Sequence, residues 1–398
     1  MDRRAFLKSS LTATAAFTTL GASFWRAAFA THPAPEAGTG PYGDLGTADA
    51  NGIRLPEGFS SRILARSAEL VPGTAYAWHH VPDGAATFAT ADGGWIYVCN
   101  SESPVPMGGV SAIRFDAAGD IAGPLAAYRI LEGSSINCAG GPTPWGTWLS
   151  CEEHPAGLVW ECDPTGVLPG IPRPALGTFS HEAAAVDPEH GHVYLTEDQS
   201  DSLFYRFTPA SPRDLSSGLL EAASVAPDGS VQWLTVPQPN SVSPATRHQV
   251  PSATRFRGGE GAWFDAVART VYFTTKGDDK VWAYNVDNAV IEVFFDSRAT
   301  PGSPLNGVDN LTVSPGREIF VCEDHSSAPH QLVMLSAIEG KVVASTFLEL
   351  VGHEGSELTG VCFDPSGRRM YLSSQRGPLN VPPIGLGITY EISGPFNV

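Results

Sequence analysis

Charged side chains are scarce in this sequence, and positively charged ones are the scarcest. Only 17% of the 398 residues are charged, and 24 lysines and arginines stand against 42 aspartates and glutamates, for a formal net charge of −18. Such an acidic surface repels the phosphates of nucleic acids and the head groups of anionic membranes. We therefore expect no nucleic acid as a partner, and a phosphate-bearing ligand only where bound cations reverse the local sign of charge.

Several diagnostic motifs are also absent. The six cysteines contain no CxxC pair of the kind that binds zinc, and the sequence has no GxSxG, P-loop or GxGxxG fingerprint. After residue 30 no hydrophobic run is long enough to span a bilayer, so we expect no stable membrane span. These absences argue against a serine hydrolase of the nucleophile-elbow type, a P-loop nucleotidase and a dinucleotide-binding enzyme.

The N-terminus has the pattern of an export signal. Residues 3–8 read Arg-Arg-Ala-Phe-Leu-Lys, an apolar run follows over residues 11–24, and Ala-Phe-Ala at 28–30 suits signal peptidase. The pattern predicts a twin-arginine signal peptide over residues 1–30, the twin-arginine export machinery as a partner, and a periplasmic or secreted protein. Residues 31–50, rich in proline, glycine and alanine, are expected to form an extended arm.

Glycine and proline are abundant, and short hydrophobic strands recur at a regular interval. The chain has 42 glycines and 33 prolines, which suits a β-protein with many tight turns. The recurring strands begin at 96, 147, 193, 271, 319 and 370, which are 51, 46, 78, 48 and 51 residues apart. Intervals of 40 to 50 residues are typical of propeller blades with four strands each. We predict an all-β, six-bladed β-propeller over residues 51–398, with an insertion at about 211–252. The propeller should be closed by pairing of residues 59–65 with the C-terminal strand near 387–392. We expect the protein to be a monomer.

Acidic side chains gather where these strands begin and end. Residues that enter the first strand of a hairpin include Asn137, Glu182, Glu260, Asp309 and Glu357. Residues that leave the second strand are Cys151, Glu152, Glu153, Glu197, Asp198, Glu323 and Asp324. If the strands surround one axis, these side chains meet at one mouth, where they repel one another, take up protons or hold metal cations.

The ligand types indicate which metals would suit such a mouth. Carboxylate oxygens suit hard cations such as calcium, and the thiolate of Cys151 favours a transition metal beside them. Lys276 replaces an acid in its blade, and it either binds an anionic substrate or balances charge. The alternative for the acids is that each one only forms a turn or cap at its strand end.

Four blocks of sequence resemble the PhoX-type alkaline phosphatases. The longest covers residues 137–153, Asn-Cys-Ala-Gly-Gly-Pro-Thr-Pro-Trp-Gly-Thr-Trp-Leu-Ser-Cys-Glu-Glu, and shorter ones cover residues 179–182, 259–263 and 357–360. The blocks follow the family's order, and the resemblance extends over about residues 50–396. It implies a six-bladed propeller that carries ferric iron (Fe3+) and calcium at one end and hydrolyses phosphate monoesters.

The resemblance also implies site residues. It points to Cys151 for iron and to further metal ligands at Glu152, Glu182, Glu260 and Glu357, while Glu197, Asp198, Asp309, Glu323 and Asp324 fit by their position in the repeat. The family pattern places an arginine near the last glutamate block, but residues 352–357 contain none. Because arginine binds phosphate through a bidentate fork, Lys276 and Arg376 become the candidates for phosphate contact.

Two other functions stay open at this point. A PhoX-like propeller that binds metal without phosphatase activity would have the same acids at its mouth. A lactonase-type hydrolase on a propeller would need one calcium ion and no thiolate, so its activity would not depend on Cys151.

Overall fold

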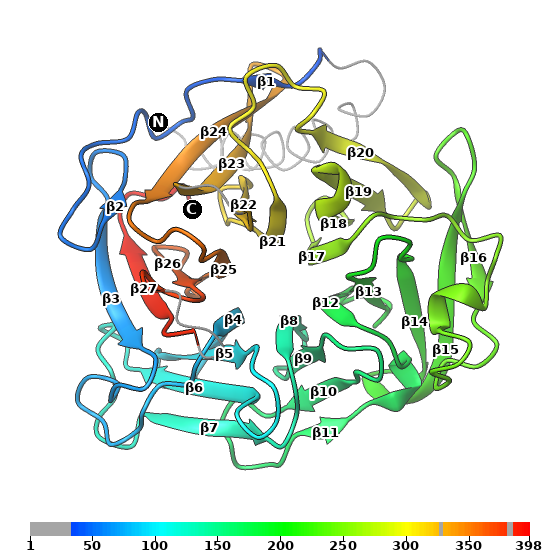
Figure 1. The fold of residues 1–398 in the computed structure, drawn as a ribbon, viewed down its shortest axis with the longest axis horizontal. Helices are drawn as coiled ribbons and strands as arrows, with labels where there is room; N and C mark the ends of the chain where they lie inside the picture. Colours follow the sequence, from blue (N-terminus) through cyan, green and yellow to red (C-terminus); the bar gives the residue numbers. More distant parts are fainter. Residues whose placement is uncertain (1–32, 326–328, 380–384) are drawn as a thin grey trace, which may run out of the picture.

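The computed structural model describes residues 33–325, 329–379 and 385–398. Its strands form six separate sheets that stand around one axis, each with its first strand innermost (Figure 1). Neighbouring inner strands contact one another all the way round the axis. The all-β, six-bladed propeller expected from the sequence is confirmed.

The first three blades are built from consecutive antiparallel strands, numbered outward from the axis. The first contains β4 (Pro82–Ala89), β5 (Trp95–Ser101), β6 (Gly109–Phe115) and β7 (Ala127–Glu132). The second contains β8 (Asn137–Pro142), β9 (Trp148–Glu152), β10 (Val159–Cys162) and β11 (Ile171–Pro172). The third has a fifth strand and contains β12 (His181–Val186), β13 (Val193–Glu197), β14 (Tyr205–Ser211), β15 (Asp214–Val225) and β16 (Val231–Thr235).

The other three blades follow the same plan. The fourth contains β17 (Gly259–Asp265), β18 (Thr270–Thr275), β19 (Lys280–Asn285) and β20 (Val290–Asp296). The fifth contains β21 (Val308–Val313), β22 (Ile319–Glu323), β23 (His330–Ile338) and β24 (Lys341–Leu350), with β1 (Glu36–Ala37) and β2 (Ile53–Arg54) at its edge. The sixth contains β25 (Leu358–Phe363), β26 (Arg369–Ser374), β27 (Ile388–Ser393) and β3 (Ser60–Arg66).

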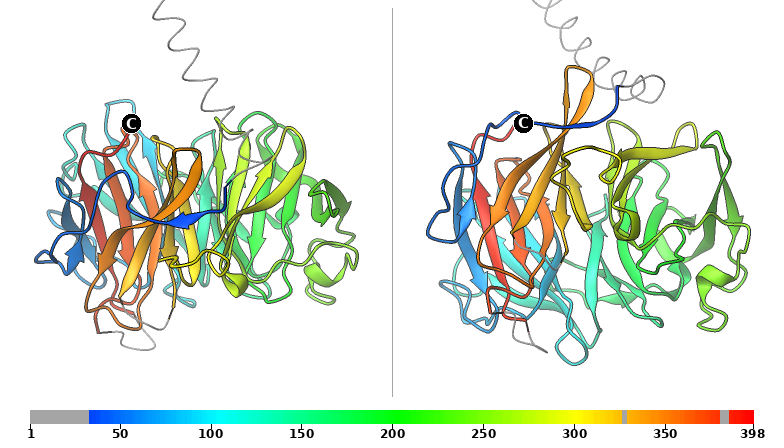
Figure 2. Two further views of the ribbon diagram at one scale, coloured as in Figure 1. Left: turned by 90° about the horizontal axis from the view of Figure 1, so that it is seen from above. Right: turned by 45° about the horizontal axis from the view of Figure 1, so that its top comes forward.

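The propeller is closed by strands from both ends of the chain. Strand β3 pairs antiparallel with β27, with Ser60 opposite Ser393 and Arg66 opposite Ile388. This matches the pairing expected from the sequence to within one residue. Further upstream, β1 runs parallel to β24 on the outside of the fifth blade, beside the β23–β24 hairpin (Figure 2). The predicted signal peptide, residues 1–30, lies outside the described residues, and none of the described helices is long and apolar enough to cross a bilayer.

The core lies between the blades. The second strand of each blade is buried on both faces, as in β13 and β22, where every residue is buried. One hydrophobic cluster joins the second and third blades through Leu149, Val159, Leu195 and Phe207. Because both faces of these strands need apolar partners, their sequences are short continuous apolar runs, which is why they were recognisable as a repeat.

Each of the six inner hairpins contains a shift of register close to the start of its first strand. In five blades the first residue inside the shift carries an acidic or thiol side chain: Asp83, Cys138, Glu182, Glu260 and Asp309. A bulge of this kind bends the strand and turns one side chain out of the regular alternation. The repeated bulge therefore gives five blades the same way of presenting a ligand atom at the axis.

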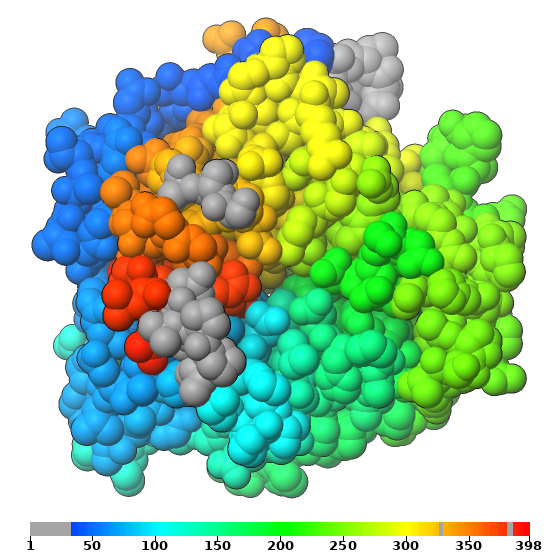
Figure 3. Space-filling model, in the orientation of Figure 1, coloured from blue at the N-terminus to red at the C-terminus, as the bar shows by residue number. Residues whose placement is uncertain are grey.

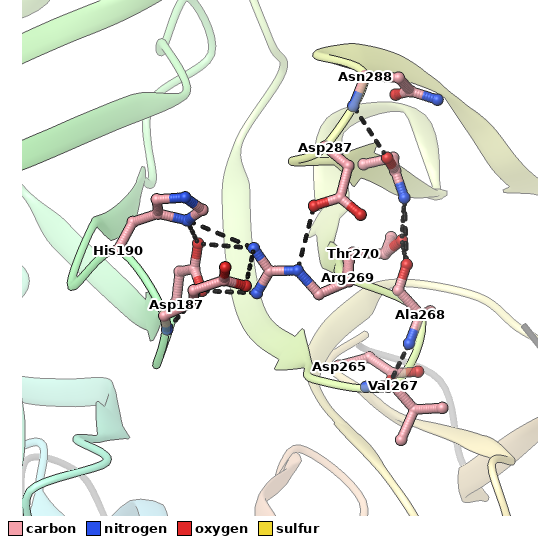
Figure 4. A network of polar contacts seen from close by, with 11 residues as sticks. Asp187, His190, Asp265, Val267, Ala268, Arg269, Thr270, Asp287 and Asn288 are labelled. Atoms are coloured by element: carbon pink, nitrogen blue, oxygen red, sulfur yellow. Dashed lines mark hydrogen bonds and ion pairs between the residues drawn. The ribbon is translucent and has the colours of Figure 1, made fainter.

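Ion pairs tie neighbouring blades together at a distance from that region. Arg269, which precedes β18, contacts Asp187 of the third blade at 2.8 Å and Asp287 of its own blade at 3.1 Å (Figure 4). Arg317, in the same position of the next blade, contacts Asp265 at 2.7 Å. Burial by itself would raise the pKa of Asp187, but hydrogen bonds from Arg269 and His190 hold that pKa below its usual value.

Replacing Arg269 with alanine should destabilise the propeller by about 2–3 kcal/mol, because it leaves the buried carboxylate of Asp187 without its main partner. Urea denaturation followed by tryptophan fluorescence would measure the change. The matched control is Arg114→Ala, which removes an ion pair to Asp92 whose two side chains are both exposed and should cost less than about 1 kcal/mol. Equal effects of the two variants would contradict the inter-blade role of Arg269.

Candidate metal centre

Nine side chains form a continuous series around the axis, which we call the axial cluster. It consists of four groups whose ligand atoms lie within 4.8 Å of one another: Asp83, Glu102 and Cys138; Cys138, Glu153 and Glu182; Glu182, Glu260 and Asp309; Asp309, Asp324 and Glu357. Because Cys138, Glu182 and Asp309 each belong to two groups, the four groups are linked. All six blades contribute, and their loops close tightly around the centre of the face in Figure 3.

The axial cluster draws on two positions of the repeat. One is the bulge at the start of the inner strand, and Glu357, directly before β25, supplies the sixth blade. The other is the residue directly after the second strand of a blade, which is Glu102, Glu153 or Asp324 in three blades. In the remaining blades this position holds Asp198, Lys276 and Gln375.

The side chain of the last residue within each second strand makes contacts outside the axial cluster, mainly hydrogen bonds with neighbouring loops. Glu152 accepts hydrogen bonds from the backbone N–H groups of Ser135 (2.9 Å) and Leu158 (3.1 Å). Glu323 accepts hydrogen bonds from the N–H groups of Asn306 and Gln331, both at 2.8 Å. Successive side chains of a strand point to opposite sides, so these carboxylates lie on the other side from the residues that follow them.

Glu197, the last residue of β13, also makes its contacts outside the axial cluster. Its carboxylate accepts a hydrogen bond from the Tyr205 hydroxyl at 2.7 Å and forms an ion pair with Arg247 at 3.0 Å. The structure therefore places Glu152, Glu197 and Glu323, which the sequence suggested as metal ligands, in loop and core contacts and outside the four ligand groups.

The thiol that lies among the carboxylates is not the one suggested by the family resemblance. Cys151, suggested by the family resemblance as the iron ligand, is completely buried in the apolar cluster between the second and third blades. Cys138 lies in the axial cluster, and its thiol donates a hydrogen bond to Oε1 of Glu182 at 3.3 Å. The geometry thus offers the thiol of Cys138, and not that of Cys151, to a metal.

Sequence reasoning missed three members of the axial cluster, Asp83, Glu102 and Cys138, and it counted Glu153 among the acids at the strand ends without assigning it to a metal. Aligning the ends of the second strands would have singled out Glu102 and Glu153, because they follow β5 and β9 as Asp324 follows β22. Cys138 follows Asn137 at the register shift as Glu182 follows His181. The structure brings together five of the expected ligands, which are Glu182, Glu260, Asp309, Asp324 and Glu357. Asp198 lies outside the four groups but close enough to raise the pKa of Glu153 and Glu260.

Burial and mutual repulsion keep protons on much of the axial cluster when it holds no cation. Burial, with a contribution from Glu102, raises the pKa of Asp83 to about 7, and burial with Asp198 raises that of Glu153 to about 8. The pKa values of Glu182 and Glu357 lie well above the usual range, again mainly through burial. Oε2 of Glu182 is buried and has no hydrogen-bond partner among the described residues. An unpartnered buried carboxylate oxygen among other carboxylates is what a cation-binding site offers to its ion.

Two cationic side chains reach the axial cluster. The Lys276 ammonium lies 3.1 Å from Oε1 of Glu260 and 2.9 Å from Oδ2 of Asp324. The Arg376 guanidinium lies 3.1 Å from Oε1 of Glu357. Both are about one-third exposed. They are the two residues that the sequence suggested for phosphate contact, and both stand between the carboxylates and solvent.

Metal-free protein should lose stability as the pH rises from about 4 to about 8. Across this window the folded protein retains protons on Asp83, Glu102 and Glu153, whose folded pKa values are about 7, 7 and 8, while the unfolded chain has released them. The melting temperature measured in a chelator should therefore fall by several degrees from pH 5 to pH 8. Calcium added at pH 8 should reverse the loss, and a melting temperature that rises with pH in the chelator would contradict this account.

The donor set fits the metals that the resemblance implies. The two groups built on Asp309 contain only carboxylates, which suit calcium, whereas both groups that contain Cys138 offer a thiolate as well, which suits iron. Within the described residues, eight carboxylates and one thiol face two cationic side chains, so bound cations would relieve a large excess of negative charge.

One family model matches most of this chain. A family model described as "Alkaline phosphatase PhoX" matches residues 116–158, 154–293 and 286–377. None of the curated proteins matches the sequence.

Solved structures with a TM-score above 0.5 share the fold. The structure of Pseudomonas fluorescens PhoX in complex with vanadate, a transition state analogue, is 16% identical, with a TM-score of 0.72 and coverage of 91% of this chain and 98% of that chain. A Bacteroides thetaiotaomicron protein of unknown function is 9% identical, with a TM-score of 0.53 and coverage of 84% and 76%. A gluconolactonase from Xanthomonas campestris is 12% identical, with a TM-score of 0.49 and coverage of 89% and 99%.

Proposed function

This chain belongs to the PhoX family of alkaline phosphatases, and from that premise we propose that it is an exported, metal-dependent hydrolase of phosphate monoesters. The observation that carries the proposal is the axial cluster, in which four linked ligand groups surround one axis. The complex of Pseudomonas fluorescens PhoX with vanadate supports the same reaction class for a protein of the same fold. The twin-arginine pattern at residues 3–8 supports export to the periplasm or the medium.

We assign the metals by ligand chemistry. Iron would be held by Cys138 with Glu153 and Glu182 as its neighbours, and calcium by the carboxylates of Glu260 and Asp309 and their partners in the axial cluster. When bound, such cations supply Lewis-acid activation of the phosphoryl group and neutralise its charge.

The chain's own residues would bind and orient the ester. Arg376 and Lys276 stand at the exposed edge of the axial cluster, each paired with a carboxylate. Arg376 can present two parallel N–H donors to phosphate oxygens, and Lys276 adds a compact positive charge. Gln375 holds Asp83 through its amide at 2.6 Å and so fixes one wall of the site. Arg376 would replace the arginine that the family pattern places near the last glutamate block and that residues 352–357 lack.

The test is elemental analysis of exported protein combined with hydrolysis of p-nitrophenyl phosphate before and after chelation. We expect iron and calcium in the protein, turnover at alkaline pH, and loss of at least about 90% of the activity after chelation, because several kcal/mol of charge stabilisation disappear with the cations. Metal content without turnover on a panel of phosphate esters would favour a metal-binding protein. Turnover of lactones that survives Cys138→Ala would favour the calcium-dependent lactonase.

A further inference from the structure

A hollow of about 840 Å³ lies beside the axial cluster, at the first blade. Its walls include Tyr76, His79 and His80 from the segment between β3 and β4, Met107 from the β5–β6 loop, and Arg129 of β7. None of these residues belongs to the axial cluster or to the phosphate contacts proposed above.

The hollow is joined directly to strand β5, which delivers Glu102 to the axial cluster. The Ser101 hydroxyl donates to the carbonyl of His80 at 2.7 Å, and the N–H of Glu102 donates to the carbonyl of Val81 at 2.9 Å. On its other side, the wall at Gly133 continues into the segment where the carbonyl of Ile136 accepts the N–H of Glu153 at 2.8 Å. The wall of the hollow is thus hydrogen-bonded to the residue that directly precedes Glu102 of the axial cluster.

Arg129 carries a positive charge that no described carboxylate neutralises. Its Nη1 donates to the Ser111 hydroxyl at 3.3 Å, and its Nη2 donates to the backbone carbonyls of Met107, at 2.8 Å, and Gly108. A guanidinium has five N–H donors, so the Nε hydrogen and one Nη1 hydrogen have no acceptor within the described residues. Glu132, at the rim, is exposed and forms no ion pair with it.

His79 supplies a second, independent observation. Its side chain is only 6% exposed and lines the hollow, yet neither ring nitrogen makes a well-aligned hydrogen bond within the described residues, a weak contact with the Asn100 backbone apart. Its ring packs on Trp78 with centroids 4.3 Å apart, which fixes its orientation. A buried polar group without a partner costs about 1–3 kcal/mol unless a water or a ligand satisfies it.

We propose that this hollow is an anion subsite for the leaving group, so that the protein prefers phosphate monoesters that carry a second anionic group, such as a carboxylate. The inference rests on the proposed phosphatase function. Arg129 supplies the charge, His79 supplies a ring donor, and Tyr76, whose hydroxyl hydrogen-bonds with that of Ser111 at 2.7 Å, borders the same space.

The test compares kcat/KM for 3-phosphoglycerate and for glycerol 3-phosphate, two three-carbon esters that differ by one carboxylate. We expect the wild-type protein to favour 3-phosphoglycerate by about tenfold or more, the order of one hydrogen bond between charged groups. Arg129→Gln should reduce that ratio by about tenfold. The matched control is Arg114→Gln on β6 of the same blade, an exposed arginine paired with Asp92, which should leave the ratio unchanged.

Each result decides between the two proposals. A wild-type ratio near one overturns the subsite whatever the variants do, while turnover of both esters keeps the phosphatase. If neither these two esters nor p-nitrophenyl phosphate is hydrolysed, the phosphatase proposal fails, and calorimetric titration with glycerate decides the subsite. Glycerate binding that Arg129→Gln weakens about tenfold and Arg114→Gln does not supports the subsite, and equal binding by all three proteins overturns it.

Discussion

Replacing Glu182 with glutamine should lower kcat for p-nitrophenyl phosphate by about a thousandfold, with loss of bound metal. Glu182 belongs to two of the four ligand groups, so its carboxylate contributes to both the thiol-containing and the all-oxygen part of the axial cluster. Metal cations contribute several kcal/mol to stabilising the charge of the transition state, and each 1.4 kcal/mol is a factor of ten in rate. Steady-state kinetics and elemental analysis of the same preparation measure both effects.

Glu292→Gln is the matched control for this variant. Glu292 lies on β20, away from the axial cluster, and burial raises its pKa to about 7, so it is a buried carboxyl with a raised pKa like those of the cluster but outside it. We expect unchanged metal content and activity within about twofold, since glutamine keeps the volume of the side chain nearly the same and the site of change is not a metal ligand. Full activity of Glu182→Gln with unaltered metal content would refute the axial cluster as the metal centre.

Replacing Cys138 with alanine should remove iron and lower kcat by about a hundredfold or more, because a thiolate is the ligand that selects a transition metal among oxygen donors. Cys138 is the thiol that lies among the carboxylates of the axial cluster, 3.3 Å from Glu182. Calcium held by the all-carboxylate groups should stay bound. Iron and calcium measured separately, together with the visible absorption of the iron–thiolate, would show whether the loss is confined to iron.

Cys151→Ala is the informative counterpart, since the family resemblance pointed to that residue and the structure does not. Cys151 is completely buried beside Val159 and Phe179, so alanine should cost roughly 1 kcal/mol of stability through a small cavity and leave iron and turnover intact. Loss of iron in Cys151→Ala with iron retained in Cys138→Ala would reverse our assignment.

The architecture was predictable because it depends on local and periodic features. Buried second strands such as β13 and β22 read as short apolar runs, and their intervals of about 50 residues revealed the number of blades. Closure by β3 and β27 could be anticipated because a propeller must pair its two ends to remove the exposed edges of the first and last blades. The site was predictable only in part, and the errors share one cause.

That cause is the period of two along a strand. A shift of one residue moves a side chain to the opposite side, so placing the end of β9 one residue early exchanges Glu152 for Glu153. Glu153, the residue after β9, belongs to the axial cluster. The carboxylate of Glu152 instead accepts hydrogen bonds from the N–H groups of Ser135 and Leu158. The bulge that turns Cys138 to the axis has no local sequence signal, because a register shift is a relation between two strands.

By itself, the sequence determined the β class, the sixfold repeat, the excess of acid and the crowding of that acid at strand ends, because composition and periodicity are properties of the chain alone. The tertiary structure decided which member of each adjacent acidic pair reaches the axis, that Cys138 and not Cys151 joins them, and that Lys276 and Arg376 pair with Glu260 and Glu357. Those outcomes depend on register and on contacts between blades, where a displacement of a single residue, about 3.3 Å along a strand, changes the side on which a carboxylate lies.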